Sequence, residues 1–253
     1  MKKQVLITLL VASISMMGIA QNSISEFVSS VEKTHQKEAF LSKEAITMNI
    51  NVKFGGKDYL EGTLTQTTGG GNIKIEKKDG ATIIFDGSKV YAKGIAADKL
   101  GGARFDIFTW SYFLGLPYKL NDGGTKFSEA VSKKWGAQFY NSAKLSFESG
   151  TGDAPDDWYV LYQNPETKVL EGAAYIVSYG KGKEAAEKEP HAIKYDGFKT
   201  VGVVPLPTSW SFHMWNEKEG YGKQIGSVEI SNIQFITAAD FSVPKDAILA
   251  EAP

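Results

Sequence analysis

The side chains with the greatest capacity for ligand binding lie close together in the stretch from Arg104 to Leu120. A helix is predicted over residues 104–114, because Phe105, Phe108 and Tyr112 recur at helical spacing. Further apolar side chains extend the apolar surface almost all the way round this helix: Ile107, Trp110, Phe113 and Leu114. One face is enough to dock a helix on a sheet, so the remaining surface is expected to meet other protein or an apolar ligand.

The predicted ligand-binding residues all belong to this helix. Arg104 is the only arginine in the sequence, and its planar guanidinium could pair with a carboxylate or with a ligand head group. A compositional preference for lysine is the simpler explanation, and both interpretations stay open. The aromatic members of the predicted site are Phe105, Phe108, Trp110, Tyr112 and Phe113.

The same helix is flanked by residues that favour its ends. Gly115 and Pro117 are expected to end it, because glycine accepts the cap conformation and proline cannot continue the hydrogen-bond ladder. With Gly101-Gly102 on the other side, the helix could shift as a lid over a ligand. Asp106 and Thr109 are predicted to form a narrow polar stripe on it. The alternative is that the aromatic helix is plain core.

Other polar clusters predict no catalysis. Asp153, Asp156 and Asp157 crowd one loop, and with Glu148 they could bind a hard cation. Their spacing lacks the regular alternation of a calcium loop, so a solvated turn is favoured. No nucleophile–base or metal-ligand spacing is visible, so we expect no enzyme activity, no metal site and no cofactor.

Two histidines are interpreted as structural. His35 ends an amphipathic helix predicted over about residues 23–36, where the helix dipole favours the protonated imidazole. A capping role is preferred to metal binding, because no second histidine lies at ligand spacing. His213 is expected to share a strand face with Ser211 and Trp215. The opposite, buried face is expected to hold Trp210, Phe212 and Met214.

The rest of the chain predicts the strands that position the central helix. Apolar and polar residues alternate from Ala45 to Phe54, and glycine-rich turns separate further short strands. The segment 180–190 is charged and is expected to be mobile and exposed. The fold class predicted is mainly β (α+β): an unclosed antiparallel β-barrel or curved sheet wrapped over an N-terminal helix and the central aromatic helix. The predicted strands cover 45–54, 59–67, 72–77, 81–85, 89–93, 138–148, 157–163, 170–179, 191–204, 208–216 and 223–237.

The N-terminus has the pattern of a secretory signal peptide. Lys2 and Lys3 precede a short apolar run, and small residues lead up to Ala20. Residues 1–20 are therefore predicted to be the signal peptide, and residues 21–253 to form a single domain. A retained membrane anchor is the alternative, but the apolar run is too short for a membrane span.

Composition narrows the compartment and the partners. The sequence has no cysteine, which excludes disulfides, thiol catalysis and a lipidated N-terminal cysteine. We therefore expect a periplasmic protein without a lipid anchor or an integral membrane span. The formal net charge is −1, and it becomes −3 when Lys2 and Lys3 are removed. This near-neutral balance argues against a nucleic-acid partner.

The order of these parts resembles the lipoprotein localization factor superfamily (LolA/LolB-like). The likeness rests on the signal peptide, the leading helix, the strands around an aromatic helix, and the closing segment Phe241–Pro244. Tyr112–Gly124, Trp158–Tyr162 and Thr167–Leu170 are similar to a branch of uncharacterised exported proteins in that superfamily. The carriers of the superfamily place an arginine early in their first strands, whereas this chain has only lysines there. Their release mechanism is therefore not transferred.

The resemblance implies a half-barrel that shelters lipid or acyl chains. The function expected is a soluble periplasmic carrier or binder of a lipid-like or acylated ligand, with a hydrophobic small molecule, an acylated protein or an envelope protein as partner. One alternative is a ligand-independent protein-interaction or envelope-stress sensor module of the same fold. A weaker alternative is an unrecognised hydrolase.

Overall fold

One antiparallel sheet organises the computed structural model, which describes residues 23–252. The predicted signal peptide, residues 1–20, lies outside the described residues. The order across the sheet is β15-β5-β4-β3-β2-β1-β14-β13-β10-β9-β8-β7-β6. Its strands are β1 (Ala45–Phe54), β2 (Lys57–Thr67), β3 (Ile73–Lys77), β4 (Thr82–Phe85), β5 (Val90–Lys93), β6 (Thr125–Trp135), β7 (Gln138–Phe147), β8 (Tyr159–Gln163), β9 (Leu170–Tyr175), β10 (His191–Asp196), β13 (Ser209–Asn216), β14 (Gly220–Ile236) and β15 (Ile248–Leu249).

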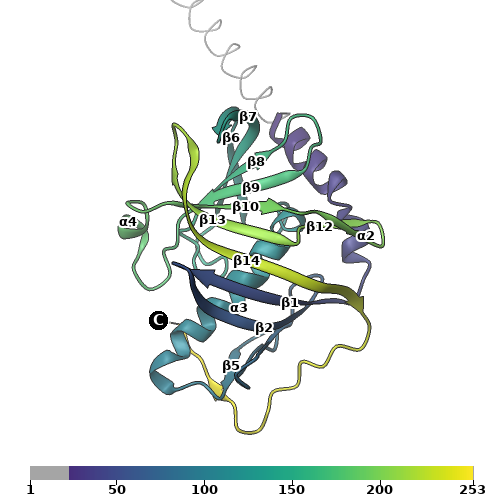
Figure 1. Cartoon of the computed structure of the whole chain (residues 1–253), viewed down its shortest axis with the longest axis vertical. Helices are drawn as coiled ribbons and strands as arrows, with labels where there is room; N and C mark the ends of the chain where they lie inside the picture. Colours follow the sequence, from purple (N-terminus) through teal and green to yellow (C-terminus); the bar gives the residue numbers. More distant parts are fainter. Residues whose placement is uncertain (1–22, 253) are drawn as a thin grey trace, which may run out of the picture.

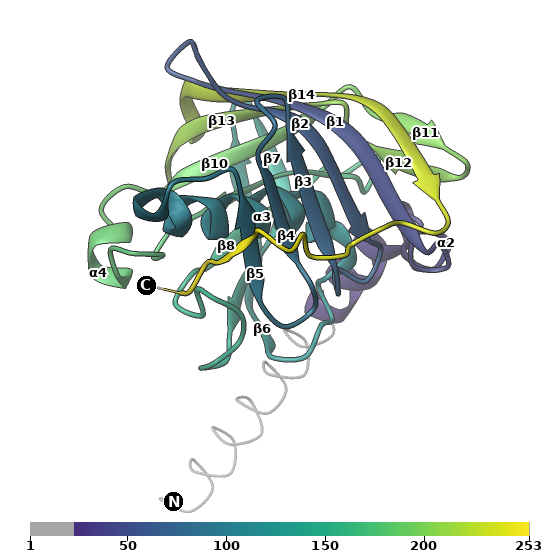
Figure 2. The same ribbon diagram turned by 90° about the horizontal axis from the view of Figure 1, so that it is seen from below.

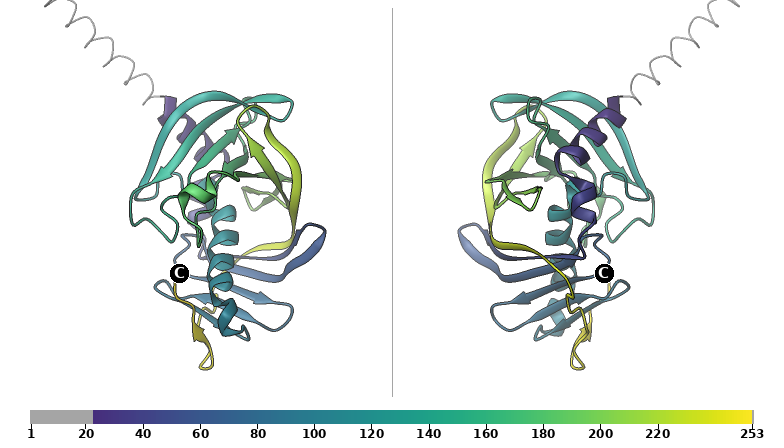
Figure 3. Two further views of the ribbon diagram at one scale, coloured as in Figure 1. Left: turned by 90° about the vertical axis from the view of Figure 1, so that its left-hand side faces the viewer. Right: turned by 90° about the vertical axis from the view of Figure 1, so that its right-hand side faces the viewer.

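The sheet is strongly curved, and its two edge strands, β15 and β6, are not paired with each other (Figures 1 and 2). The long helix α3 (Leu100–Gly115) lies in the hollow of the curve, as both views in Figure 3 show. The predicted unclosed barrel over a central helix is therefore confirmed. The shorter elements are a helix over residues 23–34, α2 (Lys37–Leu41), α4 (Lys183–Ala186), the 3₁₀ helices η1 (Ala97–Lys99) and η2 (Leu116–Tyr118), and a small two-stranded sheet of β11 (Lys199–Val201) and β12 (Val204–Leu206).

Strand β1 shows how the sequence pattern builds this sheet. Ile46, Met48, Ile50 and Val52 are buried, and the residues between them are half-buried or exposed. This is the period-two pattern predicted from the sequence, because successive side chains of a strand point to opposite faces. The buried side chains of β1 belong to one core that also includes residues of α3 and of the N-terminal helix.

Several predicted elements differ from the observed ones in their boundaries, and not every strand was predicted. The strand predicted over 191–204 ends at Asp196, because Gly197 (φ 65°) and Gly202 (φ 66°) make turns in the left-handed region that glycine accepts most readily. Strand β6 was not predicted, since most of its residues are half-buried or exposed and a bulge interrupts it between Ser128 and Val131. The exposed segment 180–190 contains α4, whose Ala186 is buried.

His35 is neutral and buried, so the prediction of a protonated, helix-capping imidazole was wrong. Its Nε2 atom accepts a hydrogen bond of 3.0 Å from the backbone N–H of Leu170 on β9. Burial lowers the pKa of His35 to about 4. The imidazole therefore joins the N-terminal helix to the sheet instead of interacting with the end of its own helix.

The alternation predicted around His213 is broken by irregular register. Trp210 and Phe212 are buried as predicted, but Met214 is 40% exposed and His213 is itself buried. Register shifts between Phe212 and Trp215 rotate the side chains out of strict alternation. The His213 ring is held by Ser211 Oγ and by the carbonyl oxygen of Gly222, each at 2.9 Å.

Helix α3 begins four residues earlier than predicted. Gly101 and Gly102 lie within its first turn, so they do not form a hinge before the helix. The helix ends at Gly115 as predicted, but Gly115 keeps right-handed helical geometry and the chain continues into η2, which contains Pro117. Within residues 23–252, no helix has both the length and the apolar character needed to cross a membrane.

Candidate ligand-binding cavity

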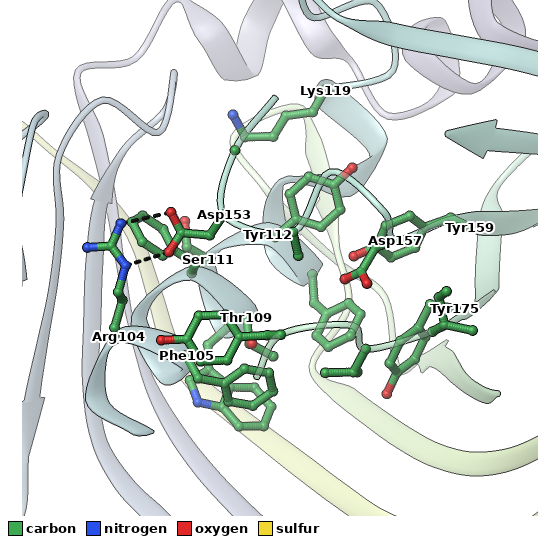
Figure 4. A pocket seen from close by; sticks show the side chains of 18 of the residues that line it. Arg104, Phe105, Thr109, Ser111, Tyr112, Lys119, Asp153, Asp157, Tyr159 and Tyr175 are labelled. Atoms are coloured by element: carbon green, nitrogen blue, oxygen red, sulfur yellow. Dashed lines mark hydrogen bonds and ion pairs between the residues drawn. The ribbon is translucent and has the colours of Figure 1, made fainter. Parts of the chain in front are cut away.

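A cavity of about 710 Å³ lies between α3, the concave side of the sheet and the loop between β7 and β8 (Figure 4). The structure brings all six residues of the predicted site to its wall. Their contact with a ligand stays a prediction. They are Arg104, Phe105, Phe108, Trp110, Tyr112 and Phe113.

The aromatic residues of α3 divide into two groups. Trp110 and Phe113 are only 2% and 4% exposed, and Phe212 lies against both of them. These two rings are core residues that also close one side of the cavity. In contrast, Phe105, Phe108 and Tyr112 are half-buried and line the cavity with accessible ring surface. The two interpretations of the aromatic helix, core and ligand wall, therefore apply to different residues of it.

Arg104 is paired with a carboxylate at the rim of the cavity. Its Nε and Nη2 atoms donate to the two oxygens of Asp153 at 2.6 and 2.8 Å, and its Nη1 atom donates to the carbonyl of Ala250 at 3.1 Å. The guanidinium also lies 5.3 Å from the centre of the Phe108 ring. Of the two functions that the sequence allowed for this guanidinium, the structure provides the carboxylate partner. Figure 4 shows the ion pair.

Asp106 is buried rather than part of a polar stripe on the surface. One of its oxygens accepts hydrogen bonds from the Tyr59 hydroxyl at 2.8 Å and from the Trp110 indole N–H at 3.2 Å. Burial raises the pKa of Asp106 to about 6, and the two hydrogen bonds act in the opposite direction. This group fixes the Trp110 ring and joins α3 to β2.

A second carboxylate, Asp157, enters the cavity on the side away from Arg104 (Figure 4). One of its oxygens accepts a hydrogen bond of 2.7 Å from the backbone N–H of Ser178, and burial raises the pKa of this carboxyl group. The rings of Tyr112, Tyr159 and Tyr175 stand around it. Sequence reasoning noticed Asp157 only as part of an acidic turn.

Tyr159 and Tyr175 were missed because nothing local marks them. They lie on β8 and β9, more than forty residues from α3, and only the curvature of the sheet brings them to the helix. The acidic loop itself is not a simple solvated turn, since Asp153 and Asp157 are engaged and only Asp156 is exposed without a cavity contact. Within the described residues, no group of three or more histidine, cysteine or acidic side chains could hold a metal ion.

An open antiparallel sheet wrapped over a central helix, with a cavity between them, is the fold of the LolA superfamily. A LolA superfamily protein from Nitrosomonas europaea matches with a TM-score of 0.51 and 11% identity, over 81% of this chain and 97% of that chain. A DUF1329 family protein from Desulfovibrio piger gives a TM-score of 0.52 and 11% identity, over 84% and 94%. A putative outer membrane lipoprotein-sorting protein domain from Vibrio parahaemolyticus gives 0.47 and 11%, over 83% and 93%.

The family to which the chain belongs is shown by its sequence. Residues 6–219 match the family described as "Family of unknown function (DUF6503)", and the chain belongs to that family. No curated protein matches the sequence. At 11% identity, the two solved structures with TM-scores above 0.5 show the fold alone.

Proposed function

We propose that this protein is a periplasmic carrier or binder of a lipid-like or acylated ligand. The observation that supports the proposal most directly is the cavity of about 710 Å³ beside α3. Its volume lies within the range of small-molecule sites, which are typically about 300–1,000 Å³ and mostly apolar. Phe105, Phe108 and Tyr112 supply apolar ring surface for an acyl chain.

The proposed compartment follows from the N-terminal sequence. Residues 1–20 have the features of a cleaved export signal, and the chain has no cysteine that could carry a lipid anchor. A carrier of apolar molecules between two membranes needs a sheltered interior and a polar outside, and the LolA fold suits this role. We propose binding without catalysis, because the walls of the cavity are rich in aromatic side chains and Arg104 is already paired with Asp153.

The proposal is tested with protein purified from the periplasm without detergent. N-terminal sequencing should begin at Gln21, and mass spectrometry of the organic extract should find about one lipid-like molecule per protein. The emptied protein should then take up the neutral fluorescent probe N-phenyl-1-naphthylamine. Absence of both lipid and probe binding would overturn the proposal. A stable protein partner captured without any lipid would support the interaction module instead.

A further inference from the structure

The lobe of the cavity around Asp157 has a wall of aromatic rings. The ring centres of Tyr112 and Tyr159 are 5.2 Å apart, and those of Tyr159 and Tyr175 are 6.1 Å apart. Phe147 on β7 lies 6.3 Å from Tyr112 and 6.1 Å from Tyr159. All four rings line the same cavity: Tyr112 and Phe147 are half-buried and offer ring surface to a bound group, whereas Tyr159 and Tyr175 are only 8% and 7% exposed and form the back of this wall.

The charges around the cavity are unevenly matched. Arg104 is paired with Asp153, and Lys119 lies 3.3 Å from Asp122. Asp157 has no such partner: within the described residues its carboxylate forms no ion pair, and it accepts a hydrogen bond of 2.7 Å from the neutral Ser178 N–H.

Two further basic residues belong to this region, Lys181 and His191, and neither forms an ion pair with Asp157 within the described residues. The positive charge of Lys181 acts to lower the pKa of Asp157. Its Nζ atom, however, lies 3.9 Å from a carboxylate oxygen of Glu189 and is paired with that residue. His191 lies 6.0 Å from the Tyr175 ring, and burial lowers the pKa of its imidazole, so it stays uncharged at neutral pH. Asp156, the adjacent residue, adds negative charge and is exposed. The lobe therefore combines aromatic walls with unmatched negative charge.

We propose that this lobe binds the ammonium group of a cationic amphiphile, whose apolar chain lies along α3. An ammonium group is attracted by the faces of tyrosine and phenylalanine rings, and more strongly where water is excluded. The carboxylate of Asp157 adds a direct charge partner. A fatty-acid carboxylate in the same position would face the negative charge of Asp157. The inference rests on the proposed function and specifies the chemistry of the ligand's head.

The test compares head groups on one chain length. N-phenyl-1-naphthylamine is bound to the emptied protein and displaced by dodecyltrimethylammonium, by dodecanoate or by dodecanol, each below its micelle-forming concentration. The wild-type protein should bind the ammonium compound at least about tenfold more tightly than the carboxylate, because the ring faces and the Asp157 charge attract a trimethylammonium group whereas the same charge repels dodecanoate. Dodecanol should fall between them.

Two variants test whether the Asp157 carboxylate causes the preference for the ammonium compound. Asp157→Asn removes the charge but keeps an oxygen for the Ser178 N–H, and it should reduce ammonium binding by about tenfold while dodecanol binding stays unchanged. Asp156→Asn is the matched control, because it removes the same charge from the exposed neighbouring residue. It should leave the preference intact.

The outcomes separate the inference from the proposed function. Equal or tighter binding of dodecanoate by the wild-type protein would overturn the ammonium site, as would equal effects of the two asparagine variants. In both cases displacement of the probe would leave the lipid-binding function standing. No binding of the probe itself would overturn the proposed function. The comparison of dodecyltrimethylammonium with dodecanoate on the wild-type protein tests the ammonium site even if Asp157→Asn fails to fold.

Discussion

Arg104 and Asp153 form a two-point ion pair that joins α3 to the loop between β7 and β8, with N–O distances of 2.6 and 2.8 Å. Both side chains are largely buried, at 15% and 22% exposure. The third contact of the guanidinium, to the carbonyl of Ala250, includes the C-terminal segment in the same junction. One side chain therefore holds three segments that are far apart in the sequence.

We expect Arg104→Lys to loosen this junction. A lysine ammonium cannot form the planar two-point contact with Asp153 and also reach Ala250. The free energy of unfolding should fall by about 1 kcal/mol, the typical value of one hydrogen bond. Hydrogen exchange should become faster in residues 248–252, measured by mass spectrometry. Unchanged exchange in this segment would contradict the role assigned to Arg104.

The two groups of aromatic residues on α3 should respond differently to truncation. Trp110→Ala removes a ring that is 2% exposed, so it should lower the free energy of unfolding by about 3–5 kcal/mol. Phe105→Ala removes a half-buried ring at the cavity wall and should cost less than half as much. The second variant should weaken binding of N-phenyl-1-naphthylamine.

The measurements are urea unfolding and probe titration on both variants. Phe113→Ala is the control for Trp110→Ala, since Phe113 is equally buried on the same helix. A large loss of stability in Phe105→Ala with unchanged probe binding would mean that the cavity wall is plain core.

Local patterns in the sequence predicted much of the fold. The alternation in β1 and the aromatic periodicity of α3 depend on residues that are close in the chain, so they can be read without the structure. Strand β6 gave no such signal, because only Trp135 of its residues is buried and the others are half-buried or exposed without regular alternation. The first turn of α3 was missed because glycine disfavours helices, yet η1 leads directly into Gly101 and Gly102.

The candidate site was only half predictable. Its α3 half follows helical spacing, whereas Asp157, Tyr159 and Tyr175 reach the cavity through the curvature of the sheet. The protonation of His35 was mispredicted for a similar reason. The helix dipole is a local effect that the sequence reveals, but burial against β9 is a tertiary effect, and here it outweighs the dipole.

His35 makes the fold sensitive to acid. Its pKa is about 6.5 in the unfolded chain and about 4 in the folded protein, so between these values the unfolded chain binds more protons. The stability contributed by the neutral imidazole is complete above pH 6.5 and is lost as the pH falls towards 4. Protonation at Nε2 also removes the acceptor for the Leu170 N–H.

We expect His35→Gln to reduce this acid sensitivity, because glutamine does not titrate and can still accept from the Leu170 N–H. Between pH 7 and pH 4 the variant should lose up to about 3 kcal/mol less stability than the wild-type protein does. Urea unfolding at several pH values measures this difference. His213→Gln is a control, since it makes the same substitution at a second buried histidine, which is held by Ser211 and Gly222. Parallel pH profiles of wild type and His35→Gln would rule out the assignment.

Asp106 should make the folded protein less stable as the pH rises, which is opposite to the effect of His35. Burial raises its pKa from 3.8 to about 6, so between these values the folded protein binds more protons than the unfolded chain. The stability that this shift contributes is complete below pH 3.8 and is lost as the pH rises through 6.

Asp106→Asn keeps an oxygen to accept from Tyr59 and Trp110 but carries no charge. Its free energy of unfolding at pH 7 should exceed that of the wild-type protein by up to about 3 kcal/mol, and the gain should shrink towards pH 4. Urea unfolding at pH 4 and pH 7 measures both values. A variant less stable than wild type at pH 7 would show that the ionised carboxylate is stabilised by its two hydrogen bonds, and that burial does not decide its protonation.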